Sequence, residues 1–339
     1  MSAVPPTAAA STILPPRIDV HVHLGGIGTN DSGIRVSPRF RRGIAFRVLL
    51  HSLGVTRELL KQADRLYVDG LAQRVRDSTT IDHAVALAMD GRWRGGEIDY
   101  EHSPLVIPND WSRDASRLHP ELLFGASVNP NRPDALDELD RVADDGAVLL
   151  KWLPNVMGID PSDRAHVPFY KKLADLSLPL LTHCGHEFTL PGGDSSVADP
   201  DRLERALDEG VKVIAAHAGT LCWKHLPGLS TSGIESLARL AERHPRLYVD
   251  LAALTTILRG WQLRTVLDEP RLAGRLLDAT DFPVPCLPLT QLGRAPWAAI
   301  RAASRLDNPF DRDRALKVAA GLPEEATRTA AGVLRLKRG

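Results

Sequence analysis

The sequence RIDVHVHL, residues 17–24, alternates polar and apolar side chains in the manner of a β-strand and carries two histidines. Seven more short apolar runs follow it, and segments with helical spacing separate them. Several runs are apolar on both faces, which is typical of parallel strands covered on both sides. We therefore expect strands at residues 17–24, 83–89, 122–128, 147–153, 178–184, 211–217, 247–253 and 276–282.

Polar residues end the last five runs at regular intervals. They are Lys151, His183, His217, Asp250 and Asp281, which are 32, 34, 33 and 31 residues apart. One βαβ unit takes about 30 residues. A doubly wound sheet would show the same alternation, but a closed barrel also brings polar strand ends from the whole chain to one mouth. The sequence therefore predicts an α/β fold, a (β/α)8 TIM barrel.

The segments between the runs predict helices, and two longer segments do not fit the repeat. Helices are expected at residues 56–76, 133–145, 168–177, 200–209 and 233–244. The long segment after the first run predicts an insertion over the barrel mouth, and residues 294–339 predict C-terminal helices outside the barrel. Residues 1–16 lack the basic and apolar regions of a signal peptide and are expected to be a disordered leader. Residues 17–339 are then one barrel domain.

Composition excludes several classes of protein. The 339 residues contain 42 Lys and Arg against 42 Asp and Glu, so the zero net charge argues against nucleic-acid binding by bulk attraction. No apolar run reaches the 18 residues of a membrane span. The three cysteines are too few for a disulfide framework, which favours a cytoplasmic location. A homodimer is the expected assembly, because most oligomers are dimers.

His21 and His23 are the first candidate metal ligands. Alternation along a strand places both side chains on the same side, toward the barrel interior. Two imidazoles in this position could share one cation, although such a pair could also serve packing alone.

Lys151 ends the fourth run among apolar residues, in LLKW. Burying an unpaired ammonium is costly, so its charge requires an ion pair or access to the barrel rim. Alternatively, Lys151 is a neutral amine that captures carbon dioxide as a carbamate. A carbamate has carboxylate oxygens and can bridge two metal ions.

His183, His217 and Asp281 end the fifth, sixth and eighth runs, so all three are expected at the carboxyl ends of strands. Asp278 lies three residues before Asp281 and is expected to face the opposite side. Cys184 is expected to face the helices, as the strand neighbour of His183. Asp281 is therefore the expected metal ligand and proton carrier.

The motifs DVHVHLGG, KWLPNVMGIDP, LPLLTHCG, VIAAHAG and ATDFP together resemble the amidohydrolase superfamily, and in particular its amidohydrolase 2-like branch. The resemblance covers residues 17–290 and implies a divalent metal cofactor, one or two ions, most often zinc. It implies that the ligands are His21, His23, Lys151, His183, His217 and Asp281, with Lys151 carbamylated in the two-metal case. It also implies that Asp281 shuttles a proton and that, in one-metal members, His217 orients the attacking water.

Three functions follow as alternatives, each acting on or binding a small molecule. The first is a metal-dependent hydrolase of an amide, lactone or ester bond. The second is a metal-dependent, non-oxidative decarboxylase, for which five arginines between residues 35 and 47 could bind the carboxylate. The favoured interpretation of these arginines is a basic surface helix paired with acidic neighbours. The third is a non-catalytic zinc-binding protein. The sequence CWKH, residues 222–225, is the most polar candidate loop for selecting the substrate.

Overall fold

The computed structural model describes residues 14–44, 46, 47, 57–187, 189–221 and 232–336. Most of the expected leader and the CWKH loop lie outside these residues. None of the helices in the described ranges is both long enough and apolar enough to cross a membrane.

Eight parallel strands form the central sheet, and all eight expected strands are confirmed. They are shorter than the apolar runs that predicted them: β1 (Ile18–His23), β3 (His83–Leu87), β7 (Leu122–Ala126), β8 (Leu149–Trp152), β9 (Leu180–Thr182), β10 (Val213–Ala215), β11 (Leu247–Asp250) and β12 (Leu276–Leu277). Each strand pairs with the next in chain order. The sheet closes beyond β12, where Val22 and Phe282 form a parallel bridge and the His23 amide donates to the Phe282 carbonyl at 2.8 Å. The fold is thus the predicted TIM barrel.

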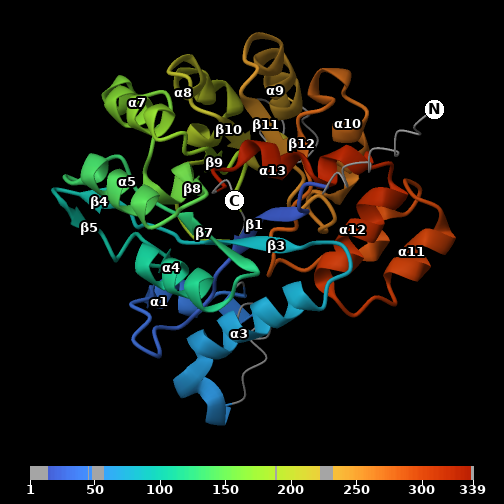
Figure 1. The fold of residues 1–339 in the computed structure, drawn as a ribbon, viewed down its shortest axis with the longest axis horizontal. Helices are drawn as coiled ribbons and strands as arrows, with labels where there is room; N and C mark the ends of the chain where they lie inside the picture. Colours follow the sequence, from blue (N-terminus) through green and yellow to red (C-terminus); the bar gives the residue numbers. More distant parts are fainter. Residues whose placement is uncertain (1–13, 45, 48–56, 188, 222–231, 337–339) are drawn as a thin grey trace, which may run out of the picture.

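Helices separate the strands and surround the barrel (Figure 1). The longer ones are α3 (Ala63–Arg76), α4 (Asn109–Leu118), α5 (Ala135–Asp144), α7 (Val167–Asp175) and α9 (Ser232–Arg243). Short ones are α1 (Pro38–Arg41), α6 (Pro154–Met157), α8 (Glu204–Asp208) and α10 (Leu263–Leu267). Apolar residues three and four apart explain their packing, as in α5, where Leu139, Val142 and Ala143 are buried.

Short elements complete the connections. The expected helices 56–76 and 200–209 each begin as a 3-10 turn, η1 (Arg57–Gln62) and η4 (Pro200–Leu203). The other 3-10 turns are η2 (Arg164–His166), η3 (Ser195–Ala198), η5 (Ala216–Gly219), η6 (Gly260–Gln262), η7 (Pro270–Leu272), η8 (Pro288–Gln291) and η9 (Glu324–Thr327). Two small antiparallel sheets pair β2 (Arg35–Val36) with β6 (Leu105–Val106) and β4 (Trp93–Arg94) with β5 (Glu97–Ile98).

The C-terminal segment is helical, as expected, and its helices pack at two different places on the barrel. Helices α11 (Trp297–Ala303) and α12 (Pro309–Ala319) pack together beside α3. Helix α13 (Thr329–Val333) instead packs against β1 and β12 and is followed by a bond from the Arg335 amide to the Val148 carbonyl, just before β8. The end of the chain therefore covers the amino-terminal end of the barrel, opposite the mouth.

The barrel interior is filled by one cluster of buried side chains, which includes Ile18, Val20, Leu149 and Ile214. A second, larger cluster fills the space between strands and helices and includes Val22 and Leu24. The pairing of β1 with β3 shifts register between Asp19 and Val22. This bulge reverses the alternation part-way along β1. Apolar residues therefore line the barrel interior toward its amino-terminal end, and the histidines line it at the mouth.

The insertion after β1 folds around a buried carboxylate. Asp64 of α3 accepts bonds from the amides of Ile27, Gly28 and Thr29, at 2.7, 3.0 and 2.8 Å, and from the Ser32 hydroxyl at 2.6 Å. A Cβ at Gly26 would lie 2.7 Å from the carboxyl carbon of Asp64, so only glycine allows this approach. The anchored loop leads into α1 at the barrel mouth.

Candidate metal centre

Three of the predicted ligands meet at the barrel mouth. His21 Nε2 lies 3.2 Å from His23 Nε2 and 3.3 Å from Asp281 Oδ1, and His23 Nε2 lies 3.2 Å from the same oxygen. Two ligand atoms about 2.0 Å from a tetrahedral zinc ion are about 3.3 Å apart. The three atoms therefore already have the spacing of one face of a zinc coordination shell.

Asp250, at the end of β11, sets the orientation of His21. Its Oδ2 accepts from His21 Nδ1 at 2.8 Å, so the proton of this imidazole lies on Nδ1 and the lone pair of Nε2 faces the other ligands. Its Oδ1 accepts from the amides of His217 and Ala252, at 2.7 and 3.1 Å. Asp250 was recognised in the sequence as a polar strand end but was not predicted to be a site residue.

Replacing Asp250 with asparagine is expected to weaken metal binding by about 10- to 100-fold, the usual effect of losing such a partner. Oδ1 accepts from two amides, so the new amide nitrogen must take the position of Oδ2 and point its hydrogens at His21 Nδ1. The imidazole then moves its proton to Nε2, which can no longer bind a cation.

Calorimetric titration of zinc into the metal-free protein measures this effect. Asp268→Asn is the matched control, because Asp268 is exposed and pairs only with Arg264 among the described residues. Equal metal affinity in the Asp250 and Asp268 variants would contradict the role assigned to Asp250.

His183 and His217 form the second part of the centre. His217 Nδ1 donates to the Ala252 carbonyl at 3.0 Å, which leaves the lone pair of Nε2 facing His183 Nδ1 at 3.1 Å. His183 Nε2 is buried without a hydrogen-bond partner among the described residues. An unpartnered buried nitrogen is costly. A cation bound at this nitrogen would satisfy it. The close group of possible ligand atoms that includes His217 is completed by His21 and Asp250 rather than by His183.

The backbone around His217 is unusual. Its φ is +57°, and that of Ala218 is +51°, so both are left-handed at non-glycine positions. Ile214 and Ala216 point into the barrel, so continued alternation would turn His217 outward, toward the helices. The left-handed turn directs the imidazole inward instead.

Lys151 lies beside His21. Its side chain is buried, and Nζ is 2.7 Å from His21 Nε2. Burial lowers the pKa of Lys151 to about 8, against the opposing charges of Asp250 and Asp281. A neutral amine is therefore accessible near neutral pH. The amine contacts the His21 atom that a metal ion would use, so binding of an ion there must displace it.

Burial also keeps the three interior histidines neutral, lowering the pKa of His21, His183 and His217 well below the ordinary range. Asp281 behaves oppositely. Burial acts to raise its pKa, but the interactions with His21 and His23 outweigh this and lower it. Neutral imidazoles and an ionised carboxylate are the forms that bind a divalent cation.

A family model for amidohydrolases matches residues 18–314. The chain belongs to the amidohydrolase family. The resemblance inferred from the motifs at the strand ends is thereby confirmed. Comparison with curated proteins gives no significant match.

Solved structures share the fold of this amidohydrolase at low sequence identity. An uncharacterized TIM-barrel protein, Bb4693 from Bordetella bronchiseptica, has a TM-score of 0.57 at 17% identity and covers 92% of this chain and 98% of its own. A protein assigned as 2-pyrone-4,6-dicarboxylic acid hydrolase from Pseudomonas putida scores 0.55 at 15%, covering 96% and 100%. The 5-carboxyvanillate decarboxylase of Sphingomonas paucimobilis scores 0.51 at 12%, covering 94% and 96%.

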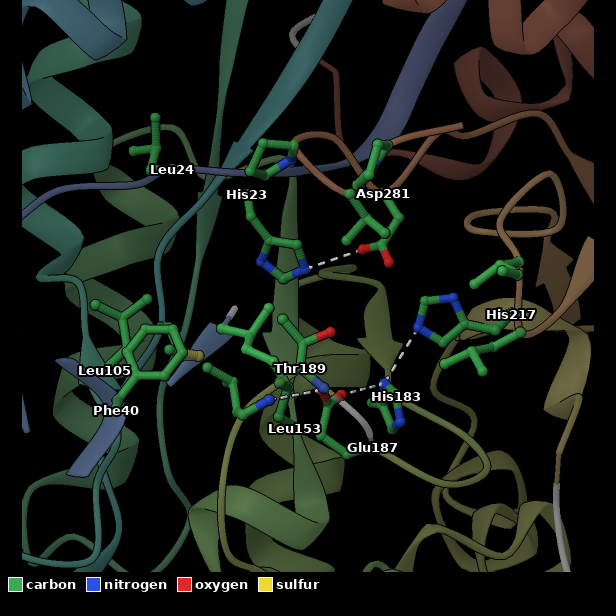
Figure 2. A pocket seen from close by; sticks show the side chains of 18 residues that line it. His23, Leu24, Phe40, Leu105, Leu153, His183, Glu187, Thr189, His217 and Asp281 are labelled. Atoms are coloured by element: carbon green, nitrogen blue, oxygen red, sulfur yellow. Dashed lines mark hydrogen bonds and ion pairs between the residues drawn. The ribbon is translucent and has the colours of Figure 1, made fainter. Parts of the chain in front are cut away.

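Above the candidate centre of this amidohydrolase lies a pocket of about 450 Å³ (Figure 2). His183, His217 and Asp281 lie on one side of it, and Leu24, Phe40 and Leu105 lie on the other. Phe40 belongs to α1, so the insertion after β1 does reach the barrel mouth, as expected.

Two charged residues beside the centre were not predicted as site residues. Glu187 lines the pocket with its Oε2 3.5 Å from His183 Nδ1. Arg259 is buried and donates to the carbonyls of Thr220 and His186, at 2.6 and 2.7 Å. It therefore ties together the loops after β9, β10 and β11. The sequence marks Glu187 only as a polar residue in the loop after the fifth apolar run, and it gives no signal for Arg259, because the partners of Arg259 are backbone atoms distant in sequence.

Other predictions about neighbouring residues have clear outcomes. Asp278 faces outward, as expected, and pairs with Lys317 at 3.1 Å and with Arg314. Cys184 is buried in the cluster between strands and helices, as expected.

Among the five arginines of the insertion, Arg35 and Arg41 contact neutral groups. Arg35 stacks on the Tyr100 ring at 5.9 Å, and Arg41 donates to the Ile27 carbonyl at 3.2 Å. Neither they nor Arg39, Arg42 and Arg47 form ion pairs within the described part of the chain. The expected pairing of a basic helix with acidic neighbours is therefore not found there.

Proposed function

We propose that this amidohydrolase is a metal-dependent hydrolase of a small molecule with an amide, lactone or ester bond. The observation that carries the proposal is the position of Asp281. Its carboxylate contacts both histidines of β1 and also lines the pocket. A single group thus reaches the candidate metal site and the space for a substrate.

His21, His23 and Asp281 are the proposed ligands of one ion, and His183 and His217 those of a second. Lys151, as a carbamate, is the proposed bridge between them. Imidazole and carboxylate donors suit zinc, and also manganese or iron(II). A bound zinc ion lowers the pKa of water to about 7 and polarises a carbonyl group.

The chain's own residues then complete the reaction. Asp281 is ionised and can accept a proton from the attacking water and deliver it to the leaving group. His217 donates through Nδ1 to the Ala252 carbonyl, which leaves the lone pair of Nε2 for a cation or, where only one ion binds, for a hydrogen bond from the attacking water. Asp250 and Arg259 position these groups without reaching the pocket lining.

The alternative is non-oxidative decarboxylation, which needs a site for a carboxylate substrate. Among the described residues that line the pocket, none is lysine or arginine. Hydrolysis of an uncharged bond is therefore the better-supported function.

Turnover in H2(18)O distinguishes the two reactions. A hydrolase places the heavy oxygen in the product acid, whereas a decarboxylase releases carbon dioxide and leaves the remaining product unlabelled. We expect labelled acid from the zinc-loaded protein. Release of carbon dioxide from aromatic carboxylates, without turnover of amides, lactones or esters, would contradict the proposal.

Metal removal is expected to lower the melting temperature by several degrees. An ion present at about 1,000 times its dissociation constant stabilises the folded state by about 4 kcal/mol, and each kcal/mol is worth about 2–4 °C in a large domain. Calorimetry before and after chelation, and again after zinc is restored, measures the change. A melting temperature independent of zinc would contradict the proposed site.

A further inference from the structure

The pocket above the candidate centre is mainly apolar. Away from the histidines, Glu187, Thr189 and Asp281, its lining consists of aliphatic, aromatic, methionine and proline side chains. They come from distant parts of the chain: the insertion after β1, the loop after β11 and the segment after Asp281. A pocket built in this way favours an uncharged, apolar group next to the reacting bond.

A second hollow of about 440 Å³ adjoins the first. The two share Ile257, which lines both. Apart from Thr290, the described lining of the second hollow is apolar, with Trp261, Leu287 and Leu289 among its residues. An apolar chain could therefore pass from the metal centre across Ile257 into the second hollow.

The exposed side chains along this path support the same conclusion. Ile257 is 72% exposed and Leu289 63%, although both are large and apolar. Scattered exposed apolar residues are common, but two in adjoining apolar hollows form a continuous surface. Covering such a surface with an apolar chain is favourable, because apolar area is removed from water.

We infer that the substrate carries an uncharged, extended apolar chain, such as a medium-length acyl group, that runs from the reacting carbonyl across Ile257. This inference rests on the proposed hydrolase function for the identity of the reacting bond. It adds the substrate class, which that proposal leaves open. The apolar lining excludes substrates that carry a carboxylate at the far end of this chain.

Binding of n-alkyl hydroxamates tests the chain separately from catalysis, because a hydroxamate chelates zinc without being hydrolysed. For the zinc-loaded protein, we expect affinity to rise about three- to fourfold per methylene from acetohydroxamate upward, the value for full burial of a methylene group. Isothermal titration calorimetry gives these affinities. Equal affinity for short and long chains, or tighter binding of the hydroxamate of succinic acid than of butanohydroxamate, would overturn the inference.

The variant Ile257→Asp tests the path between the hollows. It should lower the affinity for decanohydroxamate at least tenfold and change that for acetohydroxamate less than twofold. Leu136→Asp is the matched control, because Leu136 is 42% exposed on α5, away from both hollows. Unchanged binding of the long chain by Ile257→Asp would show that the chain does not cross this residue.

Hydrolysis is measured in parallel with hexanoyl and succinyl anilides and esters. Chain-dependent hydroxamate binding without hydrolysis of any of these compounds would reject the proposed function and leave the substrate class standing. Hydrolysis limited to the succinyl compounds would support the function and reject the apolar chain.

Discussion

Replacing Asp281 with asparagine is expected to reduce turnover by about 10²- to 10⁴-fold, the contribution of a well-placed general acid–base. The carboxylate contacts His21 and His23 and lines the pocket, so the variant loses both the proton acceptor and an anionic ligand. The side chains have nearly the same size, and the Asp281 amide still donates to the His21 carbonyl at 3.0 Å. The fold should therefore persist.

The measurements are kcat/KM on a hydrolysed substrate, circular dichroism and metal content. Asp268→Asn is again the control for a surface aspartate. Activity close to that of the unmodified protein in Asp281→Asn would refute the role in proton transfer. A loss of activity together with the folded spectrum would rule out simple unfolding as its cause.

Replacing Lys151 with methionine is expected to reduce the metal content from about two ions per chain to about one, because the proposed carbamate supplies the oxygen ligand that holds the second ion. Lys151 is the only lysine in the described part of the barrel mouth, with Nζ 2.7 Å from His21 Nε2. Methionine keeps an unbranched, apolar stem, so the buried position remains filled. The amine that would form the carbamate is removed.

Elemental analysis of protein prepared with zinc and bicarbonate gives the stoichiometry. Lys172→Met is the matched control, because Lys172 lies on the outer helix α7 and pairs with Asp140 at 2.7 Å. Short carboxylates such as acetate should partly restore the second ion to Lys151→Met, since they supply the missing oxygens. A variant that keeps two ions without any such addition would exclude the carbamate.

The architecture of the barrel follows directly from local patterns in the sequence. The eight runs predict the eight strands, and several of them are apolar along most of their length because parallel strands are covered on both sides. The regular intervals from Lys151 to Asp281 then predict a closed barrel. The ends of the runs do not predict as well where each strand ends. Strand β12, for example, contains only Leu276 and Leu277, because the chain beyond it pairs irregularly: the Asp278 amide donates to the Ala326 carbonyl and the Asp281 amide to the His21 carbonyl.

The sequence also predicts which residues gather at the mouth, since strand ends of a barrel must converge there. It could not predict Asp250 as the partner of His21, because the two are 229 residues apart and are joined by a single hydrogen bond. Nor could it predict Arg259, whose partners are backbone carbonyls that carry no sequence signal.

The sequence by itself therefore determined the fold and the residue types available at the mouth, because burial and chain length impose regular local patterns. Tertiary structure alone decided how those residues face one another. The bulge in β1 and the left-handed turn at His217 redirect side chains against simple alternation. The apolar pocket is likewise assembled from separate loops. Such arrangements depend on contacts between distant segments, and no local pattern of residues encodes them.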